Sequence, residues 1–236
     1  MQRIFTSVFF VLLLFSCTIN AQKEHLENAL KSVDQIIGLQ NTELYNGTKY
    51  VEYYRTINEN HKFFESNDFL IGSLVYSNQY YGNVPLKYDL DADDILLDIS
   101  HLKKFPVLKL YKNRLSEFSI KGKNFINIGD KTSKITKGFH EVLWFSDDIK
   151  LLKKHKKEKL KRYSTKFVHY EFFDESSYFF EYNNQIYSLN NKSDLLRVFP
   201  ANRKKINQLY NKRLVKINPK ENYILIFGEV QKSFEK

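Results

Sequence analysis

The stretch from Phe69 to Asp98, FLIGSLVYSNQYYGNVPLKYDLDADDILLD, decides the fold. Apolar and polar residues alternate along it, and turn sequences interrupt the alternation at Ser77-Asn78 and Gly82-Asn83. Because side chains on a strand point alternately to opposite faces, the pattern predicts antiparallel strands with one buried face. Pro85 has no N–H to donate, so we expect it at the start of a strand. The expected strands are 70–76, 79–81 and 85–90.

The stretch ends in Asp89-Leu90-Asp91-Ala92-Asp93, which resembles the first five positions of a calcium-binding loop. Such a loop needs Gly at its sixth position and a bidentate Glu at its twelfth, where this chain has Asp94 and Ser100. We therefore interpret the aspartates as a solvated acidic turn that leads into a strand at Ile95-Leu96-Leu97. A weak cation site completed by distant ligands is the alternative.

The same alternation predicts strands on both sides of this stretch. Asn46-Gly47 between aromatic segments predicts a hairpin. Turn residues at Lys121-Gly122 and Asn183-Asn184 separate later strands. We expect 167–172 to pair with 178–182, and a basic loop to run from Leu152 to Tyr163. The remaining expected strands are 107–111, 115–120, 125–128, 139–145, 149–152 and 185–189.

Helical spacing of apolar residues marks both ends of the chain after residue 21. We expect a helix at 23–39 to dock on the sheet through one stripe: Leu26, Leu30, Val33 and Ile37. In the tail, Ser193 is expected to cap a short helix at 194–199, and Pro200 to start the next. The expected inner face of that helix is Ile206, Leu209, Tyr210 and Leu214. The last segment repeats Tyr223, Ile226, Phe227, Val230 and Phe234 at helical spacing, although 223–227 alone would also suit a strand.

These patterns predict an α+β fold. Its main part is a long antiparallel β-meander, curled into a sandwich or a partial barrel, with an N-terminal helix and a C-terminal helical tail. The high aromatic content, 16% of all residues, suits strands because flat rings pack well on pleated surfaces. Without an internal repeat or a flexible linker in the sequence, we expect one domain at 22–236 whose helical tail begins near residue 192.

The first 21 residues have the pattern of a secretory signal peptide. Arg3 is followed by an almost wholly apolar run from Ile4 to Phe15, and Ala21 offers a cleavage site. Cys17 allows an alternative, since it lies in a sequence similar to a lipobox and could be lipidated. We favour cleavage after Ala21, which leaves no cysteine and hence no disulfide. We therefore expect an exported protein of the periplasm or outer-membrane periphery, without a transmembrane span in the mature chain.

Charge is distributed unevenly along the chain, whose formal net charge is +10. Residues 41–99 hold four basic and ten acidic side chains, a net of −6. Residues 100–236 hold thirty basic and fourteen acidic side chains, a net of +16. The two parts are expected to neutralise each other when they pack, which weakens the case for polyanion binding.

Candidate catalytic residues are few. The six histidines have no tight metal-ligand spacing, and no phosphate loop or nucleophile motif occurs. Glu141, Glu171 and Glu181 lie on expected neighbouring strands and could pair as acid and base, although outward-facing strand carboxylates are common. We expect no catalytic residue, metal or cofactor.

The basic stretch between Lys150 and Lys166 is the sharpest local feature. Its nine Lys and Arg residues are opposed only by Glu158. Such charges can guard a strand edge against pairing, or attract an anionic lipid or polysaccharide. The candidate binding residues for an anionic surface are Lys153, Lys154, Lys156, Lys157, Lys159, Lys161 and Arg162.

Several motifs resemble a family of uncharacterised exported proteins from bacteria with Gram-negative envelopes. They are NGTKYVEYYR at 46–55, GSLVY at 72–76 and NVPLKYDL at 83–90, and the similarity extends to Lys192–Tyr210. The resemblance covers most of the mature chain and implies an exported protein, and the shared motifs are structural ones, mostly turns and strand aromatics. It supplies no catalytic residues, and this chain is more basic around 150–166 than the family pattern.

We therefore expect a non-enzymatic exported envelope protein with a binding or structural role. Its partner would be an envelope protein, an anionic lipid or a polysaccharide, and not nucleic acid, which an exported protein rarely meets. The alternative is a half-barrel carrier of a lipid-like ligand, since a curved aromatic sheet can enclose one. The third interpretation is an envelope hydrolase.

Overall fold

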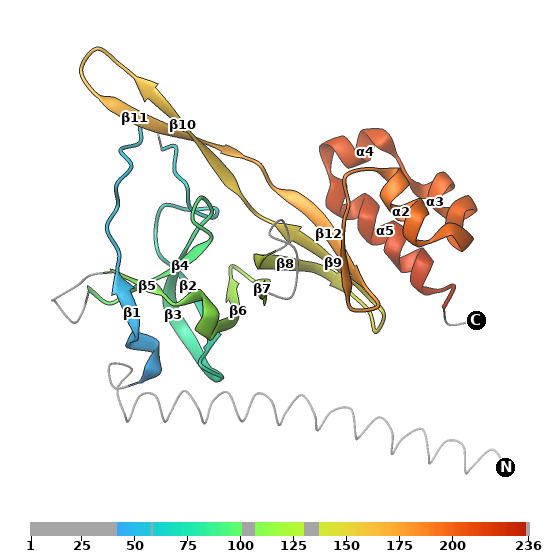
Figure 1. Cartoon of the computed structure of the whole chain (residues 1–236), viewed down its shortest axis with the longest axis horizontal. Helices are drawn as coiled ribbons and strands as arrows, with labels where there is room; N and C mark the ends of the chain where they lie inside the picture. The colour runs from blue at the N-terminus through green and yellow to red at the C-terminus, as the bar shows by residue number, and fades with distance from the viewer. Residues whose placement is uncertain (1–41, 58, 101–106, 130–136, 235–236) are drawn as a thin grey trace, which may run out of the picture.

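The computed structural model describes residues 42–57, 59–100, 107–129 and 137–234. The expected signal peptide and the expected helix at 23–39 lie outside these residues. One antiparallel sheet of eleven strands has the order β1-β5-β4-β3-β2-β6-β7-β8-β9-β12-β13, and β10 pairs separately with β11 (Figure 1). The α+β prediction is confirmed. Within the described ranges, no helix has the length and apolar character needed to cross a membrane.

The bounds of the strands are as follows. Those before residue 130 are β1 (Gly47–Lys49), β2 (Leu70–Tyr76), β3 (Gln79–Asp89), β4 (Asp94–Asp98), β5 (Val107–Leu110), β6 (Leu115–Ile120) and β7 (Lys123–Ile128). Those after it are β8 (Gly138–Phe145), β9 (Ile149–Lys154), β10 (Lys157–Tyr163), β11 (Val168–Asp174), β12 (Ser177–Tyr182) and β13 (Gln185–Ser188).

The hairpin of β2 and β3 confirms the predicted turn. Ser77 and Asn78 both have a left-handed backbone, with φ of 50° and 64°, which suits the twist of a two-residue hairpin. The predicted break at Gly82-Asn83 is wrong, because β3 continues through it with a β-bulge opposite Ser73. Pro85 therefore lies inside β3 and not at the start of a strand.

The sheet curls because of a short connection. Four residues, 111–114, join β5 to β6, although β4, β3 and β2 lie between these strands in the sheet. In a flat sheet β5 and β6 would be about 19 Å apart, at roughly 4.8 Å per strand. A four-residue connection that contains a 3-10 turn at Lys112–Arg114 is too short for that distance. The hydroxyl of Tyr76, at the end of β2, links this strand to segments next to β5 and β1. It accepts the N–H of Tyr111 at 3.2 Å and donates to the carbonyl of Asn46.

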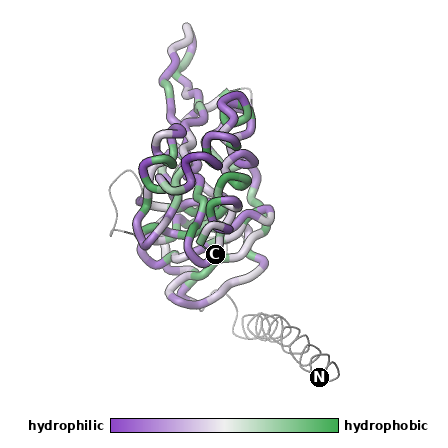
Figure 2. The backbone as a smooth tube through the Cα atoms, turned by 90° about the vertical axis from the view of Figure 1, so that its right-hand side faces the viewer, coloured by the Kyte–Doolittle hydropathy of each residue, from purple (hydrophilic) through white to green (hydrophobic). Residues whose placement is uncertain are grey.

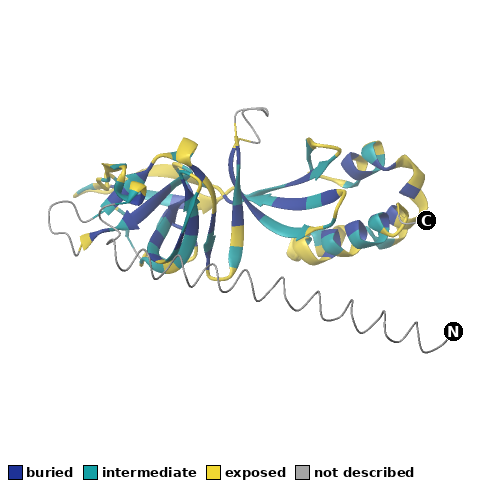
Figure 3. Cartoon of the chain, turned by 90° about the horizontal axis from the view of Figure 1, so that it is seen from below, coloured by how far each residue is buried: buried dark blue, intermediate teal, exposed yellow. Residues whose placement is uncertain are grey.

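Aromatic side chains fill the inside of the curl. The ring of Tyr88 on β3 lies 5.3 Å from Phe118, 5.5 Å from Phe125 and 6.0 Å from Phe139, centroid to centroid. All four side chains are buried, and Figure 3 shows how buried segments gather inside the curled part of the sheet. Because β3 and β8 lie four positions apart in the sheet order, the contact between Tyr88 and Phe139 requires strong curvature. The sheet is therefore a partial barrel whose interior is occupied by its own side chains.

Helices cover β8, β9 and β12 at the other end of the sheet (Figure 1). They are α2 (Lys192–Val198), α3 (Arg203–Leu209), α4 (Lys212–Ile217) and α5 (Pro219–Gln231), and a 3-10 turn at Pro200–Asn202 precedes α3. Asn191, and not Ser193 as predicted, caps α2 in a capping box with Asp194. Phe227 of α5 contacts Trp144 of β8 and Phe180 of β12, which anchors the helices on the sheet.

Most of the predicted inner face of the tail is confirmed. The fully buried residues are Ile206, Tyr223, Ile226, Phe227 and Val230, and Leu209 and Tyr210 pack against them. Residues 223–227 are helical, which excludes the strand alternative. Leu214 is exposed, so that prediction is wrong, and Phe234 lies beyond the end of α5, where its ring contacts Tyr182 and Phe199. Asn211 caps a new helix, α4, and this reorients Leu214 away from the core.

Two predicted strand pairings are wrong. Asn46-Gly47 does not form a hairpin, because Gly47–Lys49 pairs with β5 far along the chain. A Cβ on Gly47 would lie 2.7 Å from the carbonyl oxygen of Lys109, so glycine permits close strand approach here. The strand predicted at 167–172 pairs with β10 and not with 178–182, which pairs with β9 and β13.

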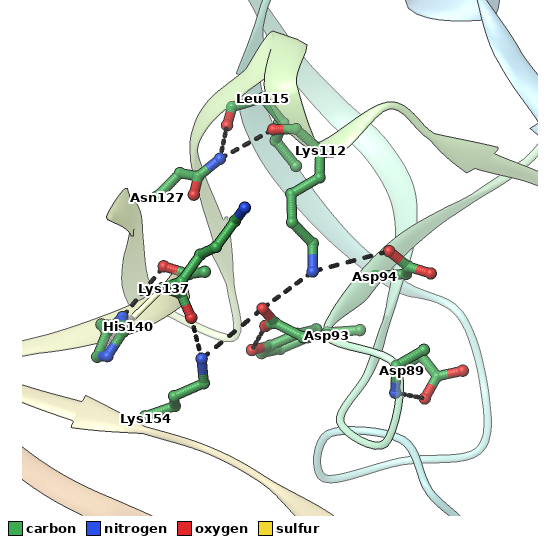
Figure 4. A network of polar contacts seen from close by, with 12 residues as sticks. Asp89, Asp93, Asp94, Lys112, Leu115, Asn127, Lys137, His140 and Lys154 are labelled. Atoms are coloured by element: carbon green, nitrogen blue, oxygen red, sulfur yellow. Dashed lines mark hydrogen bonds and ion pairs between the residues drawn. The ribbon is translucent and has the colours of Figure 1, made fainter. Parts of the chain in front are cut away.

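The aspartates after β3 are not solvated, and that prediction is wrong. Asp89 and Lys62 form a buried ion pair at 2.9 Å. Asp93 accepts the hydroxyl of Tyr88 at 2.7 Å and lies between Lys112, at 3.0 Å, and Lys154, at 4.0 Å (Figure 4). Lys154 is on β9, so its contact with Asp93 links β9 to the turn between β3 and β4.

Other ion pairs also connect the acidic and basic parts of the chain. They include Asp91 with Lys159 at 2.8 Å, Asp94 with Lys109 at 3.6 Å and Glu43 with Arg114 at 2.8 Å. The predicted neutralisation of the acidic part by the basic part is therefore confirmed.

Candidate functional site

The predicted basic loop is wrong, because strands occupy most of it. β9 and β10 continue in one register against β12 and β11: Lys154 faces Ser177, and three residues further Lys157 faces Asp174. The chain leaves the sheet after β9 and returns as β12, and β10 and β11 project between them as a two-stranded arm (Figures 1 and 2). We call residues 157–174 the ribbon.

Most of the seven candidate basic side chains are engaged within the molecule. Their partners are Asp93 and the carbonyl of Lys137 for Lys154, Glu158 for Lys156, the carbonyl of His61 for Lys157, Asp91 for Lys159 and Glu171 for Arg162. Lys153 and Lys161 lie over the rings of Tyr178 and Tyr163, at 5.7 and 5.1 Å. The seven residues are thus spread from the sheet to the ribbon and are not one free cationic patch.

The outer edge of β11 is covered at two points, by Arg55 and by Asn60. The N–H of Tyr170 donates to the carbonyl of Arg55 at 2.8 Å. The side chain of Asn60 pairs with Phe172 as a strand would: it accepts the N–H at 2.7 Å and donates to the carbonyl at 3.0 Å. The ring of Tyr54 packs edge-on against Tyr170 at 4.8 Å. An isolated two-stranded hairpin is marginally stable in water, so this covering segment supports the ribbon.

The outer edge of β10 is open beyond its base. The N–H of Lys157 points away from β11 and donates to the carbonyl of Leu90 at 3.3 Å. Alternate residues of a strand face the same side, so the backbone groups of Lys159 and Lys161 also point outward. Within the described residues these outward groups have no strand beside them.

Apolar side chains are exposed on both faces of the ribbon. Leu160 and Phe173 are diagonal neighbours on one face, and they are 44% and 46% exposed. Tyr163 and Val168 are directly opposite each other near the tip, and Tyr163 is 74% exposed. A projecting arm with exposed apolar groups is typical of a surface that meets a partner.

A cleft of about 430 Å³ lies at the base of the ribbon, between the sheet and the corner that joins α4 to α5. Its sheet side includes Glu141, Lys153, His155 and Tyr178, and its helix side is formed by residues 217–220. Nε2 of His155 lies 2.5 Å from Oε2 of Glu141, and both side chains are buried. A carboxylate only accepts, so Nε2 carries the hydrogen and Nδ1 the lone pair of the neutral ring.

Burial governs the ionisation of this pair. It lowers the pKa of His155, and Lys153 and Lys123 lower it further, while the hydrogen bond that His155 donates to Glu141 acts in the opposite direction. Burial raises the pKa of Glu141, but its hydrogen bond and attraction to His155 outweigh burial and leave that pKa below its usual value. The pair is therefore a polar group held inside the fold, and both of its residues line the cleft.

The three candidate carboxylates do not come together. Glu141 pairs with His155, Glu171 with Arg162 and Glu181 with Lys150. The sequence does not indicate the partner of Glu141, because Glu141 faces Lys153 across β8 and β9, and His155 lies two residues further, just after β9 ends. Within the ranges that the structure describes, no three His, Cys, Asp or Glu side chains gather in a way that could hold a metal ion.

Comparison of the chain with protein-family models, with curated proteins and with solved structures finds no match. The resemblance to exported bacterial proteins therefore stays a prediction, and the ribbon and the cleft are the structural features that suggest a function.

Proposed function

We propose that this chain is a non-enzymatic exported protein whose ribbon binds another protein of the envelope. The observation that carries the proposal is the open edge of β10, flanked by exposed apolar side chains on an arm that leaves the body. Exposed strand edges attract further strands, and natural proteins usually cover or shorten them. Here one edge of the ribbon is covered by Arg55 and Asn60, and the other has no strand beside it in the part of the chain that the structure describes.

The partner that fits this edge is an extended, acidic segment of another protein. Such a segment would add a third strand beside β10, with backbone hydrogen bonds for affinity and contacts to Leu160 and Phe173 for specificity. Lys161, which lies along the edge and has no ion pair among the described residues, favours an acidic side chain in that strand. A second copy of this chain fits less well, because an antiparallel pair of β10 strands would place lysines beside lysines.

The other interpretations have less support. The inside of the partial barrel is filled by Tyr88, Phe118, Phe125 and Phe139, which leaves little room there for a carried ligand. An anionic lipid or polysaccharide would need free cations, whereas five of the seven candidate basic residues contact the chain's own anions or carbonyls. Export itself rests on the signal peptide expected at residues 1–21.

Site-specific photo-crosslinking in the native envelope tests the proposal. A crosslinking residue at Leu160 should capture one defined protein, whereas one at Leu225, an equally exposed apolar position on α5, should not. Lys161→Pro removes the outward N–H and should abolish capture, and Lys161→Gln, which keeps the N–H, should retain most of it. Equal loss in both Lys161 variants would point to charge and an anionic surface. Capture that Lys161→Pro leaves unchanged, or no specific product at Leu160, would overturn the proposal.

A further inference from the structure

The cleft at the ribbon base has the dimensions and position of a ligand site. Its volume of about 430 Å³ falls within the range of small-molecule sites, roughly 300–1,000 Å³. It lies where two parts of the fold meet, the sheet on one side and the α4–α5 corner on the other. Its size suits a small molecule or the end of a chain, and not a macromolecular surface.

Positive charge is left over in this cleft. Lys123, Lys153 and Lys220 line it, together with the carboxylates of Glu141 and Asp174, which accept hydrogen bonds from His155 and Ser176. Lys123 is already paired with Glu65, but Lys153 contacts only the ring of Tyr178, and Lys220 has no ion pair among the described carboxylates. Elsewhere in the fold Lys62 and Lys112 have carboxylate partners, at 2.9 and 3.0 Å. Two ammonium groups facing one cleft without carboxylate partners are a feature that an anion would satisfy.

His155 adds a group that changes its charge. Its ring is held edge-on by Phe64, at 4.9 Å, and by the hydrogen bond to Glu141, so its orientation is set before any ligand arrives. In the neutral ring Nδ1 is an acceptor, and after protonation it becomes a donor. The charged groups that influence the ring come from several elements, and they are Glu141, Lys123, Lys153 and Asp174. An anion in the cleft would offset the lysines and favour the protonated ring.

We propose that this cleft binds a small ligand through a phosphate or carboxylate group contacted by Lys153 and Lys220, and that His155 takes up one proton from solvent when the ligand binds. The proposal is independent of the ribbon's partner, because the cleft faces the helices and the open edge of β10 does not line it. Binding and protonation are linked, so the ligand binds more tightly as the pH falls.

Sulfate is the first probe, because its charge is constant over the relevant pH range, and succinate is the second, to separate oxyanions from carboxylates. The ring nitrogens of His155 are followed by NMR through a pH titration with and without each probe. Sulfate should raise the pKa of His155, and its affinity should increase up to about tenfold per pH unit as the ring becomes protonated. An effect of succinate alone would identify the ligand group as a carboxylate.

Lysines without an ion pair among the described carboxylates provide variants that leave the fold intact. Lys153→Gln and Lys220→Gln should each weaken binding of the effective probe by about tenfold or more, the usual loss for a charge-assisted hydrogen bond. Lys216→Gln on α4 removes the same charge outside the cleft and should change little. The proposal is overturned if neither probe moves the pKa of His155, or if Lys216→Gln weakens binding as much as the cleft variants do.

Discussion

His140 on β8 should make the stability of the protein fall as the pH drops below neutral. The side chain is fully buried, and Nδ1 lies 3.1 Å from the carbonyl oxygen of Gly138. A carbonyl only accepts, so Nδ1 carries the hydrogen and Nε2 the lone pair. Among the described residues Nε2 has no hydrogen-bond partner, and the neighbouring ring of Phe179 is apolar. Protonation would therefore place an unpaired charge inside the fold.

The magnitude follows from the pKa of this ring. Burial lowers the pKa of His140 from 6.5 to about 4, with smaller contributions from Lys154 and His155, while the carbonyl of Gly138 acts in the opposite direction. A lowered pKa means that the unfolded chain binds the proton more readily than the folded one. The stabilisation is thus complete above pH 6.5 and is lost as the pH falls toward 4, by about 1.4 kcal/mol per pH unit and about 3 kcal/mol in total.

The assay is equilibrium unfolding in urea at a series of pH values, for wild type and for His140→Asn. Asparagine keeps a donor near the carbonyl of Gly138 but does not titrate. The variant should be less stable at neutral pH because the ring is lost, yet its stability should fall less steeply with acid, by about one proton in the linkage slope. The pKa of His155 is also lowered, so some slope will persist in the variant. Parallel pH profiles for the two proteins would refute the assignment to His140.

Two further substitutions test the packing of charges and backbone. Lys62→Met leaves Asp89 buried without its cation and should lower the free energy of unfolding in urea by about 3–5 kcal/mol. Adding Asp89→Asn to the same chain should restore part of this loss. A loss near zero for Lys62→Met alone would contradict the buried pair. Gly138 has φ of 101°, and a Cβ there would collide with the carboxylate of Asp93, so Gly138→Ala should cost about 3 kcal/mol. Gly122→Ala, at φ of 69° with open space around it, should cost only about 1 kcal/mol, and equal losses would show that the contact with Asp93 is unimportant.

Local geometry could be predicted from the sequence in detail. The turns at Ser77-Asn78, Lys121-Gly122 and Asn183-Asn184 are all left-handed, as the residue types indicate. Strands β5 to β9 lie close to their predicted positions because alternation reports which side of a strand is buried. The tail was correctly expected to be helical, since its apolar residues recur at the helical period.

The choice of partner strands could not be predicted in the same way. β12 pairs with β9 and leaves β10 and β11 to project, although 167–172 and 178–182 are consecutive in the sequence. The alternation of apolar and polar residues shows that a strand has a buried face, but it does not show which other strand pairs with it, because several strands could do so and keep that face buried. Which strands pair depends on contacts between distant segments, such as those that Arg55 and Asn60 make with β11.

The sequence alone thus determined the antiparallel strands, their turns, the helical tail and the excess of basic residues in the second part of the chain. Only the tertiary structure decided the curl of the sheet, the pairing of the aspartates with lysines, the open edge of β10 and the contact between Glu141 and His155. The physical reason is range: turns and alternation act over a few residues, whereas ion pairs and clefts depend on which distant surfaces meet. For this protein the candidate functional features belong to the second kind.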